Sequence, residues 1–368
     1  MVVERARANF VAGCRRERNQ GNARVPAVPS FGRNVDRAVG GLSRLLHIRR
    51  VRHNTVGDLA PYLDAPLSVL FPDPAPEWPV ERHWSRGCRG ASMLEKLTWK
   101  SEHVPLSARY RARHAGEYAP NATVTARWIH PRTGPRRRAI VYVHGWLEPA
   151  PWRALFLPRL HDALEVDVLD LQLPFHGRRN PKSALFHGEF FWTADLVRSF
   201  EAMRQSCVDA RTLVAFLRRR GYTEVGVIGV SMGASIAMVL ACLETPPDYI
   251  VPIIGHLQLA EVIEEAAIFW RVKTDLERFG IGREQRRDIF KRFGLDQMKP
   301  RIAPARQLWV MARDDEYIRA DVVEQQWIEW GRPAIEWLDG GHMTFALSLP
   351  KIVRRVRDFH ESLGHGKN

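Results

Sequence analysis

From residue 139 onward, short runs of β-branched residues alternate with longer segments of helical periodicity. The clearest run covers residues 139–143, and the longest helical segment lies near residues 193–220. Strands that alternate with helices in this way form a parallel sheet with helices on both faces. The sequence therefore predicts an α/β fold built on a mostly parallel sheet.

The strand pattern extends on both sides of this region. Strands are predicted at residues 97–103, 108–114, 124–130, 139–143, 166–173, 224–230, 249–257, 307–311 and 334–338, with a final helix near 344–363. Residues 260–301 interrupt the alternation with a charged and largely helical insertion, which we expect to form a lid. Its apolar residues either line a pocket beneath the lid or pack on the core: Val262, Ile263, Ala266, Ile268, Phe269 and Trp270.

Positive charge is concentrated in the first part of the chain. The 368 residues carry a formal charge of +14, and residues 1–60 hold +8 of it, with 12 arginines against four acidic residues. Residues 61–138 carry the other +6, so residues 139–368 are neutral overall. We therefore expect a basic N-terminal extension, residues 1–96, followed by the α/β domain, residues 97–368.

The N-terminal extension itself has little periodicity. Residues 1–36 are rich in arginine and broken by glycine and proline, so we expect them to be mostly disordered. Residues 37–52 predict a short helix, with Asp36 as its N-cap and an apolar side made of Val39, Leu42, Leu45 and Leu46. Such a basic amphipathic helix either docks on the core or lies on an anionic membrane surface.

Composition argues against several classes of protein. The four cysteines are far apart and form no CxxC pair, which disfavours a disulfide scaffold and a cysteine-based zinc site. No stretch approaches 18 uncharged apolar residues, and the first residues lack the apolar core of a secretory signal. No nucleic-acid-binding motif accompanies the charge. We expect a cytoplasmic protein without metal or cofactor and without a nucleic-acid partner.

Residues 229–233 read Gly-Val-Ser-Met-Gly, which is a GxSxG motif. The motif follows a predicted strand and opens a helix of small residues, and this strand–turn–helix arrangement is a nucleophile elbow. Its sharp turn would hold Ser231 exposed above the sheet, and the flanking glycines avoid clashes with the neighbouring strand and helix. Ser231 is therefore the candidate nucleophile.

A serine nucleophile needs a base, and the base needs an acid that orients it. In this architecture both follow the serine, first the acid and then the histidine, each in a loop after a strand. His342 ends an Asp-Gly-Gly-His segment whose glycines allow the loop to fold over the site. The loop after the preceding strand offers Asp315 as the acid, because Ile318 can anchor that loop in the core. Asp314 is the alternative.

The tetrahedral oxyanion of acyl transfer needs two backbone N–H donors. One would come from Met232, directly after the nucleophile. The other is expected in the loop after the strand at 139–143, where His144, Gly145 and Trp146 stand, with the Trp146 amide pointing into the site. We interpret His144 as a brace that holds this loop through a hydrogen bond.

Taken in chain order, the His-Gly pair, GxSxG, Asp and His resemble the α/β-hydrolase superfamily, and the resemblance covers roughly residues 97–363. It implies the α/β-hydrolase fold with a helical lid over residues 260–301, and the activity of a serine esterase or lipase. Residues 174–178, Pro-Phe-His-Gly-Arg, are also similar to dienelactone-hydrolase-like and lipid-deacylating branches of the superfamily.

Two arginines, Arg178 and Arg179, lie in this last loop, at the carboxyl end of a predicted strand and on the same rim as Ser231. Guanidinium groups there would hold a carboxylate or phosphate of the substrate. The alternative is an exposed basic loop.

The sequence favours a serine hydrolase that cleaves a carboxylic ester or thioester, in a small molecule or a lipid, through an acyl-enzyme intermediate. Two alternatives stay open. One is a non-catalytic protein of the same fold that makes peripheral contact with an anionic membrane through its basic N-terminal region. The other is a peptidase of the same fold.

Overall fold

The computed structural model describes residues 30–43, 49–84 and 92–364. Residues from Phe31 onward form one compact unit. Disorder was predicted for residues 1–36. Residues 1–29 lie outside the described residues, as do two positions of the predicted apolar helix face, Leu45 and Leu46, and for residues 31–36 the prediction is wrong because they are helical. None of the described helices is long and apolar enough to cross a bilayer.

A mixed sheet runs through the described part of the chain, with the strand order β1-β2-β3-β5-β4-β6-β7-β8-β9. The first three strands pair antiparallel, and the pairing from β5 through β4 to β9 is parallel. The strands are β1 (Glu81–Trp84), β2 (Ser92–Lys100), β3 (Thr123–Pro131), β4 (Arg138–Val143), β5 (Asp167–Leu171), β6 (Glu224–Val230), β7 (Tyr249–Ile253), β8 (Leu308–Ala312) and β9 (Ala334–Leu338). The predicted α/β fold with a mostly parallel sheet is confirmed.

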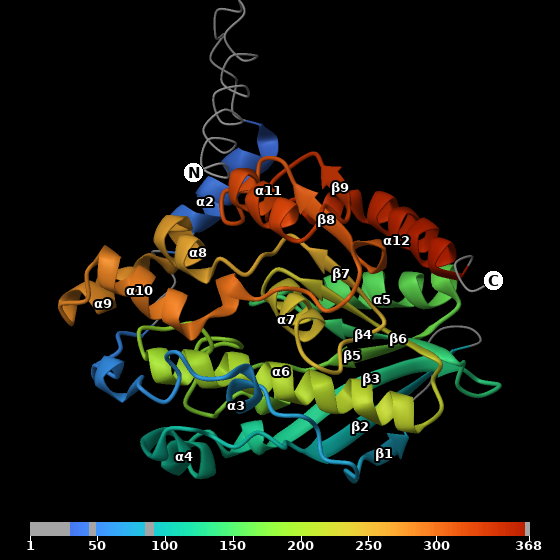
Figure 1. Cartoon of the computed structure of the whole chain (residues 1–368), viewed down its shortest axis with the longest axis horizontal. Coiled ribbons are helices and arrows are strands. Elements are labelled where there is room, and N and C mark those ends of the chain that lie inside the picture. The colour runs from blue at the N-terminus through green and yellow to red at the C-terminus, as the bar shows by residue number, and fades with distance from the viewer. Residues whose placement is uncertain (1–29, 44–48, 85–91, 365–368) are drawn as a thin grey trace, which may run out of the picture. The chain divides into compact units, whose positions relative to one another are not determined.

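Helices cover both faces of this sheet (Figure 1). On one face lie α5 (Ala150–Leu164) and α12 (Leu349–Gly364), and on the other α6 (Leu196–Arg219), α7 (Met232–Ala241) and α11 (Ala320–Glu329). Successive residues of β4 contribute to the two apolar cores in turn, as Ile140 does to one and Val141 to the other. The central strands are thus buried on both faces, as expected for parallel strands.

The segment between β7 and β8 is helical. It contains α8 (Leu259–Glu265), the 3₁₀ helix η4 (Ala267–Phe269), α9 (Trp270–Arg278) and α10 (Arg283–Phe293). Buried arginine–carboxylate pairs hold these short helices together, as between Arg286 and Glu264. This is the insertion that the sequence places at residues 260–301.

Two local predictions differ from the structure. Residues 108–114, expected as a strand, form α4 (Ala108–Ala115), because the Ser107 hydroxyl accepts a hydrogen bond from the Tyr110 N–H and caps the helix. The N-terminal helix, expected at residues 37–52, is α2 (Phe31–Leu42), with Asp36 inside it and not at its N-cap. The predicted division of the chain after residue 96 falls within β2.

Helix α6 is buried along almost its whole length, although it lies on the outside of the sheet. Segments that precede β3 lie against it, among them η1 (Val56–Asp58) and α3 (Leu67–Leu70), and Figure 1 shows α3 in front of α6. Polar side chains of α6 form hydrogen bonds with the main chain of these segments. Arg204 Nε, for example, donates to the Leu70 carbonyl over 3.0 Å. The described segments that precede β3 are therefore attached to the domain.

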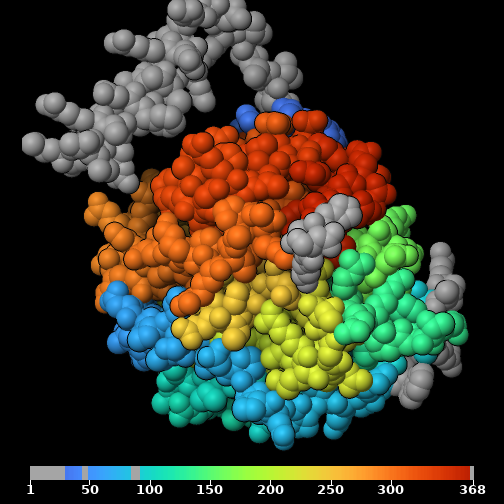
Figure 2. All heavy atoms as spheres, turned by 45° about the vertical axis from the view of Figure 1, so that its right-hand side comes forward, coloured from blue at the N-terminus to red at the C-terminus, as the bar shows by residue number. Residues whose placement is uncertain are grey.

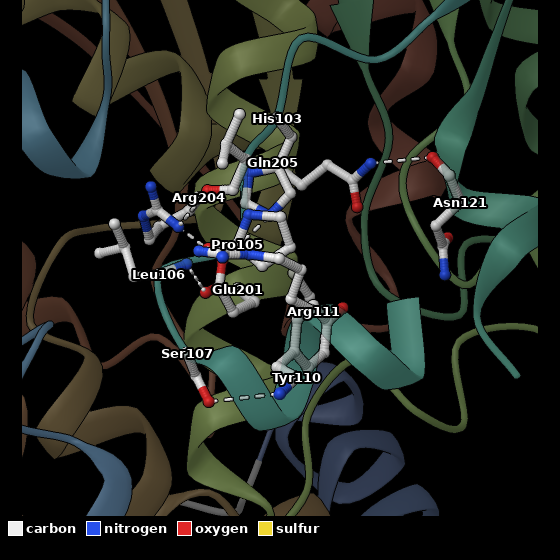
Figure 3. Close-up of polar contacts among 12 residues, drawn as sticks. His103, Pro105, Leu106, Ser107, Tyr110, Arg111, Asn121, Glu201, Arg204 and Gln205 are labelled. Atoms are coloured by element: carbon white, nitrogen blue, oxygen red, sulfur yellow. Dashed lines mark hydrogen bonds and ion pairs between the residues drawn. The ribbon is translucent and has the colours of Figure 1, made fainter. Parts of the chain in front are cut away.

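Glu201 is the centre of this contact (Figure 3). Its fully buried carboxylate accepts from the Leu106 N–H over 2.7 Å and from Arg204 Nη1, and lies 3.0 Å from His103 Nε2. Burial alone would raise the pKa of Glu201, but His103 and Arg204 outweigh it and lower that pKa to about 2. Because the folded-state pKa is depressed, this stabilisation is present above the ordinary carboxyl pKa and is lost as the pH falls toward 2.

We predict that Glu201→Gln lowers the free energy of unfolding by about 3–5 kcal/mol at neutral pH, since it leaves the Arg204 guanidinium buried without its carboxylate. Urea unfolding measures this. The exposed Glu324→Gln is the matched control and should change the free energy by less than about 0.5 kcal/mol. Equal stabilities of the two variants would contradict the role given to Glu201.

Candidate active site

Ser231 occupies a strained turn between β6 and α7, with φ 53° and ψ −114°. A Cβ on Gly229 would lie 2.0 Å from the Gly233 carbonyl oxygen, and one on Gly233 would lie 2.0 Å from that of Val143. Only glycine fits at either position, because strand, helix and the adjacent β4 approach each other so closely. The turn is held in place by the Ser231 N–H, which donates to the Ile253 carbonyl on β7.

The structure brings Ser231, His342 and Asp315 together. His342 Nε2 lies 3.0 Å from Ser231 Oγ, and His342 Nδ1 lies 2.7 Å from Asp315 Oδ2. The other carboxylate oxygen of Asp315 accepts from the N–H groups of Tyr317 and Ile318 over 2.8 and 2.7 Å. All three side chains belong to loops that follow parallel strands β6, β8 and β9, whose carboxyl ends meet at one edge of the sheet.

Asp314, the alternative acid, takes a different partner. Its carboxylate accepts from Arg33 Nη2 over 3.1 Å and has no contact with His342. Ile318 is buried, in agreement with its predicted role as the anchor of this loop. The geometry therefore selects Asp315 as the residue that orients the histidine.

His342 is embedded between carboxylates. Burial alone would lower its pKa, but the charge and hydrogen bond of Asp315, together with the charge of Asp36, outweigh burial and raise that pKa above the ordinary value of 6.5. A raised pKa strengthens the imidazole as a proton acceptor.

The two predicted oxyanion donors lie on the walls of one cavity. Met232 is the first residue of α7, where backbone N–H groups have no acceptor within the helix. Trp146 is fixed on the facing loop, because its ring stacks on Phe269 with centroids 5.4 Å apart and its Nε1 donates to the Gly188 carbonyl. A Cβ on Gly145 would lie 3.4 Å from Ser231 Cβ, so this loop passes directly beside the serine.

Two side chains, those of His144 and Glu148, hold the loop that carries Trp146. His144 Nε2 accepts from the Leu173 N–H and its Nδ1 lies 2.9 Å from the Gly145 carbonyl, which agrees with the predicted bracing role. Burial lowers the pKa of His144 to about 3, so its ring is neutral. Glu148 accepts from the Gly145 N–H over 2.7 Å, and burial raises the pKa of its carboxyl to about 7. Glu148 was not among the residues predicted from the sequence.

The cavity beside Ser231 has a volume of about 270 Å³ and an almost entirely apolar wall. The helical insertion contributes Leu259, Val262, Ile263, Ile268 and Phe269, and the rest of the domain contributes Trp146, Trp152, Trp192, Ile254 and Phe345. Among the described residues, no lysine or arginine lines it. The cavity therefore suits an uncharged, apolar group.

A family model described as "Alpha/beta hydrolase domain containing 18" matches residues 112–276. Among solved structures, acetyl xylan esterase from Paenibacillus sp. R4 is similar, with a TM-score of 0.52 and 13% identity over 76% of this chain and 89% of that chain. Residues 112–276 thus match an α/β-hydrolase domain, and the chain has the fold of the α/β-hydrolases. At this identity the structural similarity establishes the fold of the chain and leaves its substrate open.

Two curated relatives also match, the uncharacterized proteins MT2702 and Rv2627c of Mycobacterium tuberculosis. Each is 27% identical over 258 residues, which are 64% of this chain and 59% of the relative. The match thus spans less than two thirds of the length of either relative. Neither name assigns an activity.

The predicted substrate-binding arginines do not reach the Ser231 cavity. Arg179 is fully buried and donates to the Asp209 carboxylate on α6 over 2.7 Å and to the carbonyls of Gln172 and Asn121. Its guanidinium is needed there to neutralise a buried carboxylate. Arg178 is exposed and lines a separate cleft. Within the described residues, no cluster of His, Cys, Asp or Glu side chains is arranged to hold a metal ion.

Helix α2 reaches the site, a contact that was not predicted from the sequence. Val39 and Ser43 line the Ser231 cavity, and Asp36 hydrogen-bonds to the loop of His342. The signal that was available is the spacing of Gly32, Asp36 and Gly40, each four residues apart and therefore on one face of a helix. The helix is docked on the domain, which is the first of the two alternatives for it.

We predict that the pKa of His342 lies above 6.5 and that Asp315→Asn lowers it. The variant removes the carboxylate charge that raises this pKa, whereas the burial of the His342 ring, which lowers it, is unchanged. An NMR titration of the histidine ring protons, assigned with His342→Gln, measures both values. Asp339→Asn is the control, since the Asp339 side chain is almost fully exposed and its charge is screened by solvent. A His342 pKa that does not respond to Asp315→Asn would contradict the pairing.

Proposed function

We propose that this protein is a serine hydrolase that cleaves a carboxylic ester or thioester through an acyl-enzyme intermediate. The observation that carries the proposal is the continuous hydrogen-bonded chain from Ser231 Oγ through the His342 ring to Asp315. It opens onto an apolar cavity on the side of the serine. These are the parts that acyl transfer requires: a nucleophile, a base, and an acid that orients the base.

The geometry supports the following sequence of steps. His342 Nε2 accepts the Ser231 proton as Oγ attacks the carbonyl carbon, and Asp315 stabilises the resulting imidazolium. The N–H groups of Met232 and Trp146 bind the oxyanion, and His342 then donates its proton to the leaving oxygen or sulfur. A water molecule activated by His342 attacks the acyl-enzyme in the same way. The acid is released, and Ser231 regains its proton.

We predict that a fluorophosphonate probe labels the wild-type protein at Ser231 and that Ser231→Ala abolishes labelling. The same variant should lower kcat for p-nitrophenyl esters by about 10⁴-fold or more, because the three residues act as a unit. Intact-protein and peptide mass spectrometry locate the probe, and steady-state kinetics give kcat. An unlabelled wild-type protein without esterase activity would refute the proposed function.

We also predict a preference for uncharged acyl groups. With p-nitrophenyl esters of equal chain length, an acyl chain that ends in a carboxylate should have a kcat/KM about 100-fold lower than one that ends in a methyl group. The reason is that no lysine or arginine among the described residues lines the cavity, so a buried carboxylate there would lack such a partner. Equal kcat/KM values would show that the acyl chain does not enter this cavity.

A further inference from the structure

One face of α2 is built to lie directly against the domain. Gly32, Asp36 and Gly40 are its buried residues. A Cβ on Gly32 would lie 2.2 Å from the Gly341 nitrogen, and one on Gly40 would lie 2.8 Å from the Ala267 Cβ. The helix backbone is thus in contact with the His342 loop at one end and with the lid helices at the other. Figure 2 shows α2 in dark blue against the red and orange segments of the C-terminal half.

The Asp36 carboxylate connects two loops that are far apart in sequence. One oxygen accepts from the His342 N–H over 2.6 Å and from the Glu316 N–H over 3.2 Å, and the other accepts from the Met343 N–H over 2.8 Å. Asp36 itself is fully buried. One side chain therefore fixes the main chain at His342 and the main chain next to Asp315.

Only a carboxylate satisfies these donors. Both of its oxygens accept from backbone N–H groups, so an asparagine would have to present its NH₂ group to one of them. Further contacts add to the docking: Tyr317 Oη donates to the Asp36 carbonyl over 2.8 Å, and Arg33 pairs with Asp314. Helix α2 thus contacts residues on both sides of Asp315.

We infer that Asp36 is a positioning residue for catalysis, and that α2 is a part of the active site. The helix holds the His342 and Asp315 loops in register, and its Val39, together with Ser43 directly after the helix, closes the cavity beside Ser231. The inference rests on the proposed function. Asp36 acts on the reaction through the main chain of the catalytic loops, so its effect is on kcat. The Val39 and Ser43 wall acts on binding, so its effect is on KM.

The charge of Asp36 provides a second measurable effect, on the pKa of His342. The His342 ring faces Ser231, Asp315, the Tyr317 ring at 5.1 Å and, through the loop, Asp36. The Asp36 charge contributes to the raised pKa of His342. Removing that charge lowers the pKa, and the acid limb of the activity profile then moves to lower pH.

The first experiment compares full-length wild type and Asp36→Asn. We expect kcat for a p-nitrophenyl ester to fall by about 10- to 100-fold, because loss of the bonds displaces His342 from the serine. Fluorophosphonate labelling should slow by a similar factor, and the acid limb of kcat/KM should move to lower pH. Thermal unfolding verifies that the variant is folded under the assay conditions.

A steric pair on the same helix provides the matched control. Gly32→Ala pushes α2 away from the Gly341 main chain without changing any charge, and it should reduce kcat as Asp36→Asn does. Gly41→Ala adds the same methyl group on the exposed side, where nothing lies within 4 Å, and it should leave kcat unchanged.

The outcomes separate this inference from the proposed function. A labelled, active wild type together with unchanged kcat and acid limb in Asp36→Asn would overturn the positioning role and leave the function standing. A loss of activity that only follows the unfolded fraction, with an unmoved acid limb, would also overturn it. An unlabelled, inactive wild type would overturn both proposals.

Discussion

The strained turn at Ser231 is the constraint on which the rest of the site depends. A non-glycine residue at φ 53° costs on the order of 1–3 kcal/mol and persists only where its surroundings hold it. Here β6 pairs with β4 and β7 on its two sides, and α7 is buried along its whole length. Because Gly229 and Gly233 have no side chains, β6, α7 and β4 can pack in direct contact with one another. The serine thus has a fixed position. The loops after β4, β8 and β9 then place Trp146, Asp315 and His342 around it.

The parts of the site that the sequence predicts are those with a local cause. The GxSxG turn needs its glycines wherever it occurs, and the loops of Asp315 and His342 follow buried strands whose carboxyl ends meet at one edge. Residues 108–114 were predicted wrongly because their pattern leaves strand and helix open, and the Ser107 cap decides for the helix. Arg179 and Asp36 depend on partners 30 and 306 residues away, and no local pattern shows those partners.

The basic charge of the chain has a structural use within the described residues. Arginines connect segments that precede β3 to the rest of the domain, as Arg49 does with Glu189 over 2.8 Å and Arg113 with Asp195 over 3.1 Å. Others on α6 donate to main-chain carbonyls of the first segments, as Arg211 does to Phe71. A guanidinium with five donors suits such contacts, since it binds several acceptors at once. Net charge is therefore a poor guide to the substrate here, and the apolar cavity is a better one.

The segment that matches the hydrolase family model, residues 112–276, contains Ser231 and the first helices of the insertion between β7 and β8, but neither Asp315 nor His342. The proposed base and its proposed acid lie after it, and Asp36 lies before it. Helix α2 closes this arrangement, because its carboxylate binds the main chain of both later loops. If the proposed chemistry is carried out by Ser231, its rate depends on contacts between residues at the two ends of the described chain. A fragment limited to the matched segment would keep Ser231, the proposed nucleophile, and lose His342, the proposed base.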